Sequence, residues 1–249
     1  MKKFIVANWK MNGNSESAKK WAQDFMLALP QIPYGTEAVV CPPAPLVPIV
    51  NYLLGDFDIK TGAQDCHAKQ EGAFTGETSS KLLKDIGCSY VIVGHSERRA
   101  MNGENSEIVS AKAAAAINSG LIPIICIGET AKQREAGDTI KVINQQIDES
   151  LPKEAGNGNF ILAYEPVWAI GSGNLPTMDE IKQVHDAIIE RVSKSLAIET
   201  SAVSVLYGGS VKADNAGEIL ALGNVGGVLV GGASLNAPDF CKIILSAVN

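Results

Sequence analysis

The sequence predicts an α/β protein in which eight parallel strands close into a (β/α)8 barrel ringed by helices. Eight short runs rich in Val and Ile recur along the chain, and segments with helical spacing separate them. The length of 249 residues is that of one such barrel. We therefore expect residues 1–249 to form a single barrel domain.

Most of the eight runs are continuously apolar and do not alternate with polar residues. This pattern is typical of strands that are buried on both faces of a parallel sheet. The third run has a weak apolar pattern, and we assign it as a strand mainly from its position between the second and fourth runs. The expected strands cover residues 4–7, 38–40, 58–60, 90–93, 122–126, 160–163, 203–206 and 228–230.

Helical spacing between the strands is clearest at residues 106–117 and 178–196, where apolar residues recur on one stripe. Repeated strand–helix units with no linker between them predict a parallel sheet. Eight units in a chain of this length favour a closed barrel. An open Rossmann sheet is disfavoured because no strand is followed by G-x-G-x-x-G.

Composition and charge argue against two classes of binding partner, nucleic acids and membranes. The chain has 21 basic and 27 acidic residues, a net charge of -6, and no basic run longer than a pair, so we expect no nucleic-acid partner. No apolar stretch reaches the roughly 18 residues of a membrane span, and the short apolar run at 4–7 is unlike a secretory signal. We expect a cytoplasmic protein with no membrane partner.

The cysteines number five and form no C-x-x-C pair. An odd number without such spacing favours reduced thiols in the core over disulfides or a zinc site.

Polar residues with catalytic chemistry directly follow several strands. In a barrel the carboxyl ends of the strands meet at one rim, where active sites are built. Each residue alone has an ordinary structural explanation, such as a salt bridge, a core histidine or a tight turn. Their joint placement indicates one active site that contains Asn8, Lys10, His95, Glu165, Gly208–Gly209–Ser210 and Gly231–Gly232.

The glycine turns after the seventh and eighth strands predict a phosphate site. Backbone N–H groups bind phosphate dianions where the chain can approach closely, and barrels often bind phosphate in these two loops. Ser210, Gly231 and Gly232 occupy them. The apolar, glycine-containing segment 166–173 is typical of a mobile lid, which would add the amide of Gly171 to the phosphate.

Five segments in chain order resemble the signature segments of the triosephosphate isomerase family, whose members are TIM barrels. Further matches occur at 62–64 (GAQ), 72–77 (GAFTGE) and 126–129 (CIGE), so the resemblance covers the whole chain. The five segments are 8–13 (NWKMNG), 94–99 (GHSERR), 163–171 (AYEPVWAIG), 207–210 (YGGS) and 230–235 (VGGASL).

The resemblance implies an isomerase of glycolysis and gluconeogenesis that interconverts dihydroxyacetone phosphate and D-glyceraldehyde 3-phosphate through an enediolate. Glu165 would be the base, neutral His95 the electrophile and Lys10 the source of positive charge. Asn8 would orient the substrate, with Glu97 in support. We expect a helix to begin just after His95 and its N-terminus to depress the pKa of the imidazole.

The same resemblance implies that the amides of Gly171, Ser210, Gly231 and Gly232 bind the substrate phosphate and that neither metal nor organic cofactor is needed. It also implies a homodimer, formed through the loop from Gln64 to Glu77 with Thr75 near its tip.

Two other functions stay open from the residues alone. A phosphate-binding barrel of the aldolase or indole-synthase kind is one, but a Schiff-base aldolase commonly needs a lysine where this chain has Glu165. A barrel that only binds ligands is the other, and it predicts that Glu165→Asp changes no activity.

Overall fold

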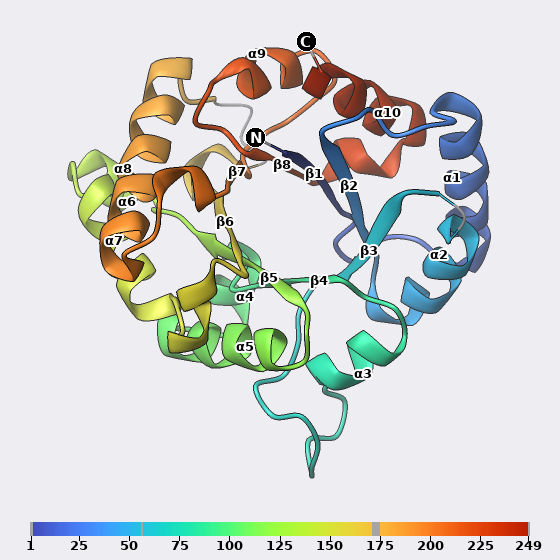
Figure 1. The fold of residues 1–249 in the computed structure, drawn as a ribbon, viewed down its shortest axis with the longest axis horizontal. Helices are drawn as coiled ribbons and strands as arrows, with labels where there is room; N and C mark the ends of the chain where they lie inside the picture. The colour runs from blue at the N-terminus through green and yellow to red at the C-terminus, as the bar shows by residue number, and fades with distance from the viewer. Residues whose placement is uncertain (1, 56, 171–174, 249) are drawn as a thin grey trace.

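The computed structural model describes residues 2–55, 57–170 and 175–248 (Figure 1). Its strands form a closed barrel in chain order, and all neighbouring strands, including β8 and β1, are parallel. The predicted (β/α)8 barrel is confirmed. The strands are β1 (Lys3–Asn8), β2 (Thr36–Cys41), β3 (Ile59–Ala63), β4 (Tyr90–Val93), β5 (Ile122–Ile127), β6 (Ile161–Tyr164), β7 (Val205–Tyr207) and β8 (Gly227–Val230).

Helices surround the barrel on the outside (Figure 1). The two helices predicted most clearly are confirmed, at α5 (Ser106–Asn118) and α8 (Met178–Leu196). No helix among the described residues has the length and apolarity needed to span a membrane. The helices are α1 (Ser15–Ala28), α2 (Val47–Leu54), α3 (Ser80–Asp85), α4 (Ser96–Met101), α5 (Ser106–Asn118), α6 (Ala131–Glu135), α7 (Thr139–Ser150), α8 (Met178–Leu196), α9 (Ala216–Ala221) and α10 (Ala237–Leu245).

The third strand differs most from the prediction. Its sequence, IKTGA, runs three residues beyond the predicted 58–60 and contains a glycine, which is uncommon inside strands. A Cβ on Gly62 would lie 2.6 Å from Cys41 Sγ in the neighbouring strand. Close packing against the neighbouring strand therefore requires glycine here. This requirement cannot be predicted from the local sequence pattern.

The core has two layers, which explains why the strands are apolar on both faces. Alternate residues such as Val6, Ile92 and Leu229 fill the barrel interior. The residues between them, such as Ile5 and Val91, pack against the helices. Both layers hold the strands in a fixed register, so the carboxyl ends of β1, β4, β6, β7 and β8 face one rim.

The five cysteines are free and buried, as predicted: Cys41, Cys66, Cys88, Cys126 and Cys241. Burial raises the pKa of Cys66 and of Cys88 to about 12, so both remain thiols at neutral pH.

Candidate active site

One cavity of about 540 Å³ lies at the carboxyl rim of the barrel. Asn8 ends β1 and Lys10 follows it, while His95 and Glu165 come directly after β4 and β6. The structure therefore brings together side chains from three distant segments. Around them lie the glycine turns after β7 and β8, with Gly208, Gly209, Ser210, Gly231 and Gly232.

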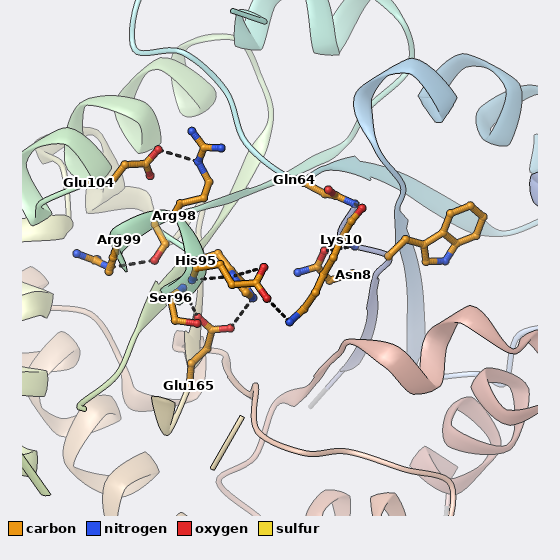
Figure 2. A network of polar contacts seen from close by, with 12 residues as sticks. Asn8, Lys10, Gln64, His95, Ser96, Arg98, Arg99, Glu104 and Glu165 are labelled. Atoms are coloured by element: carbon orange, nitrogen blue, oxygen red, sulfur yellow. Dashed lines mark hydrogen bonds and ion pairs between the residues drawn. The ribbon is translucent and has the colours of Figure 1, made fainter. Parts of the chain in front are cut away.

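Glu165 and His95 contact each other in this cavity (Figure 2). Glu165 Oε1 lies 2.9 Å from His95 Nε2, and the Ser96 backbone N–H donates to Glu165 Oε2 at 2.9 Å. Glu165 is only 2% exposed. Burial by itself would raise the pKa of this carboxyl, but His95, the Ser96 amide and Lys10 outweigh it and hold the pKa below its usual value. The group is ionised, as a base must be.

The predicted lowering of the His95 pKa is wrong. The helix is present as predicted, since α4 begins at Ser96 and the Glu97 backbone N–H donates to His95 Nδ1 at 3.3 Å. Burial favours the neutral ring, but the adjacent Glu165 charge outweighs burial and raises the pKa of His95. The Glu97 bond still matters, because it leaves the proton of the neutral ring on Nε2, facing Glu165.

Lys10 is held in a strained backbone conformation. Its φ of 52° lies in the left-handed region, which residues with a side chain rarely adopt. Asn8 Oδ1 accepts the Lys10 backbone N–H at 3.0 Å, and Gln64 Nε2 donates to the Lys10 carbonyl at 2.9 Å (Figure 2). The ammonium lies 2.5 Å from Glu97 Oε1. Glu97 therefore belongs to the site through Lys10.

Two glycines leave room for Glu165. A Cβ on Gly128 would lie 1.8 Å from the Glu165 carbonyl oxygen, and one on Gly208 would lie 2.9 Å from Glu165 Cγ. Gly128 follows β5 and Gly208 follows β7, the two strands that flank β6. A larger residue at either position would displace the carboxylate, so these glycines are packing requirements of the site.

The glycine turn after β8 lies beside Lys10. A Cβ on Gly231 would be 3.5 Å from Lys10 Cε, and the corresponding position on Gly232 faces open space. From the β7 side, Ser210 Oγ donates to the Ala169 carbonyl at 3.2 Å. Close backbone approach by an anion is therefore possible next to a cation, as phosphate binding requires.

Only part of the predicted lid is described. Residues up to Ile170 are placed, and the Trp168 indole N–H donates to Glu129 Oε1 at 2.8 Å. The Arg134 guanidinium lies over the Trp168 ring, 4.1 Å from its centroid. Gly171, predicted to donate an amide to phosphate, lies outside the described residues.

Comparison with known proteins decides the family. The family model described as triosephosphate isomerase matches residues 3–247. This chain belongs to the triosephosphate isomerase family.

Individual members of the family match over nearly their whole length. The triosephosphate isomerase of Ruegeria sp. (strain TM1040) is 47% identical over 243 residues, which cover 98% of this chain and 97% of the relative. That of Mesorhizobium japonicum is 48% identical, covering 96% and 94%. The crystal structure of triosephosphate isomerase from Bartonella henselae superposes with a TM-score of 0.91 at 38% identity, covering all of both chains.

Two residues around this cavity had no role in the site that the sequence predicted. Gln64 supports Lys10, as described above. Arg99 (Figure 2) donates from Nε to the Gly94 carbonyl at 2.9 Å. Arg99 Nη2 donates to the Cys126 carbonyl at 3.1 Å, which ties the ends of β4 and β5 together. The sequence feature that could have indicated Arg99 is its spacing, one helical turn after His95.

Proposed function

We propose that the cavity interconverts dihydroxyacetone phosphate and D-glyceraldehyde 3-phosphate, the isomerisation of glycolysis and gluconeogenesis, with Glu165, His95 and Lys10 as the reacting groups. The observation that carries this assignment is the 2.9 Å contact between an ionised, buried carboxylate and an imidazole, next to an ammonium group and two glycine turns. Asn8 and Glu97 complete the catalytic set by holding Lys10.

Glu165 acts as the base. It removes the proton from the carbon next to the substrate carbonyl and returns it to the former carbonyl carbon, while the hydroxyl proton passes to the former carbonyl oxygen, so that no atom is gained or lost. Both carboxylate oxygens are engaged by His95 and Ser96 before substrate arrives. The carboxylate must exchange these contacts for the substrate carbon as the reaction begins.

His95 and Lys10 stabilise the enediolate. Its negative charge develops on the two oxygens, and preorganised donors at those oxygens provide most of the stabilisation in such reactions. His95 donates from Nε2, while Lys10 supplies a positive charge. When Glu165 moves to the substrate, the largest of the influences that raise the pKa of His95 weakens, while burial continues to favour the neutral ring. The Glu97 N–H keeps the proton of that neutral ring on Nε2.

The amides of Ser210, Gly231 and Gly232, with Gly171 of the lid, bind the phosphate. Support comes from the open approach at Gly232 and the position of Gly231 beside Lys10. A lid over this end would also exclude water from the enediolate.

A coupled assay tests the function. Purified protein should convert glyceraldehyde 3-phosphate to dihydroxyacetone phosphate, detected by reduction of the product with NADH and glycerol-3-phosphate dehydrogenase. Phosphoglycolate should inhibit competitively, because it presents a carboxylate and a phosphate at the spacing of the enediolate. A barrel that only binds ligands would show no turnover.

We also propose that residues 1–249 act as one catalytic domain in a cytoplasmic homodimer. The loop from Gln64 to Glu77 projects from the barrel (Figure 1), and residues 71–77, including Thr75, are exposed. Phe74 is 42% exposed and Met11 95% exposed. Gln64 joins the base of the loop to Lys10, next to Met11. Exposed apolar side chains on either side of this contact favour burial by a second copy.

A further inference from the structure

Trp21 connects the outer helix α1 to the glycine turn after β8. Its indole N–H donates to the Ser234 carbonyl at 2.9 Å, although the two residues lie 213 positions apart. The side chain is buried, at 6% exposure. Helix α1 lies beside α10 on the outside of the barrel (Figure 1), so the bond reaches inward from the helical layer to the rim.

Ser234, which accepts the Trp21 hydrogen bond, closes the turn that contains Gly231 and Gly232. Ser234 N and Ser234 Oγ both donate to the Gly231 carbonyl, at 2.9 and 2.7 Å. Ser234 is fully buried. The turn is thus cross-linked internally, and the Trp21 bond fixes it to the helical layer.

The Trp21 ring also contacts the loop after β1. Its centroid lies 5.2 Å from that of Trp9 in an edge-to-face arrangement. Trp9 stands between Asn8 and Lys10 in the chain. One side chain therefore touches both the segment that carries the ammonium and the turn proposed to bind phosphate.

Trp21 also belongs to an aromatic cluster between α1 and α10. It stacks on Phe25 with the centroids 5.0 Å apart and packs against Phe240 of α10 at 6.0 Å. A leucine could fill much of this space, but it could neither donate a hydrogen bond to Ser234 nor pack its edge against Trp9.

We propose that Trp21 is a positioning residue for phosphate recognition: it sets the Gly231–Gly232 turn relative to Lys10 without touching substrate. This inference rests on the proposed function, because it assumes that the turn binds the substrate phosphate. Small errors in the placement of such groups reduce binding strongly.

The test compares variants by steady-state kinetics and by competitive inhibition with inorganic phosphate. Trp21→Phe removes the N–H but keeps an aromatic ring. Site-specific replacement of Trp21 by benzothienylalanine, which has sulfur in place of the indole N–H, keeps the shape and serves if Trp21→Phe does not fold. Both should raise KM and the phosphate inhibition constant by about 10-fold, with kcat within about twofold.

Phe25→Leu is the matched control, since Phe25 belongs to the same aromatic cluster and is fully buried. It should lower the melting temperature through lost packing but leave the phosphate inhibition constant unchanged. The proposal is overturned if the two Trp21 changes leave that constant within about twofold of the parent, or if Phe25→Leu raises it equally. Loss of phosphate inhibition in the parent protein would instead overturn the proposed phosphate site, and this inference with it.

Discussion

At the scale of single residues, the protonation states of Glu165 and His95 depend on each other. The carboxylate raises the pKa of the imidazole, and the imidazole lowers that of the carboxyl. Each effect requires the 2.9 Å contact between them. The direction of the His95 pKa is therefore set by a carboxylate 70 residues away in the chain and is opposite to the one that the residues after His95 predicted.

Replacement of the base Glu165 should remove most of the turnover but leave the binding of phosphate nearly unchanged. Glu165→Gln keeps an oxygen for the Ser96 N–H but cannot take a proton from carbon, so kcat should fall by at least about 10²- to 10⁴-fold. Inhibition by inorganic phosphate should persist. The coupled assay measures both quantities.

The control for this change is Glu190→Gln, an exposed glutamate on α8 that pairs with Lys194 one turn away. It should leave kcat unchanged. Retention of a large fraction of kcat in Glu165→Gln, or an equal loss in Glu190→Gln, would contradict the assignment of the base.

At the scale of elements, α8 packs a histidine between itself and the strands. His185 is fully buried, and its ring lies 6.0 Å from that of Tyr164 in β6 and 6.5 Å from that of Tyr207 in β7. Burial lowers its pKa to about 4, only partly offset by the Asn224 carbonyl and by Asp186. Its complete burial is that of a structural core residue.

This histidine predicts acid sensitivity of the fold. The folded pKa of about 4 lies below the usual 6.5, so the unfolded chain binds the proton first and stability falls as pH drops from 6.5 towards 4. The His185 contribution to this loss should reach about 3 kcal/mol near pH 4. Above about pH 8 it contributes almost no pH dependence, because the ring is then neutral in both states.

Urea unfolding at several pH values measures this effect. His185→Leu should unfold with a shallower loss of free energy between pH 6.5 and 4.5 than the parent protein. Gln183→Leu, on the exposed face of α8, should keep the parental slope. Equal slopes in the parent and His185→Leu would show that the ring is not the titrating group.

At the scale of the whole molecule, the projecting loop predicts the assembly. Sedimentation should give a particle of about twice the 26.2 kDa chain mass, because the exposed apolar groups on and near the loop are buried by a second copy. Phe74→Asp should shift the equilibrium to the monomer and lower specific activity at dilute concentrations. Tyr34→Asp, which is also exposed but precedes β2 at the amino end of the barrel, should remain dimeric. A parent protein that is monomeric and fully active would contradict the dimer.

Much of the fold could be predicted because it depends on local patterns. Strands buried on both faces are mostly continuous apolar runs, and this pattern predicted most of the eight strands directly. Helix α8 is marked by its stripe of apolar residues and by the Thr177–Glu180 capping box. The third strand, IKTGA, could not be predicted as well, because the glycine it contains is required by packing against Cys41 and Tyr90.

The sequence alone determined which residues could form a site, since Asn8, Lys10, His95, Glu165 and the glycine turns all follow strands whose ends must meet at one rim. Only the tertiary structure decided how these groups act on one another: the direction of the His95 pKa, the strained Lys10 backbone held by Gln64, and the bond from Trp21 to Ser234. The reason is physical. Electrostatic and hydrogen-bonding energies depend on distances of a few ångströms, and closure of the barrel sets those distances between segments far apart in the chain.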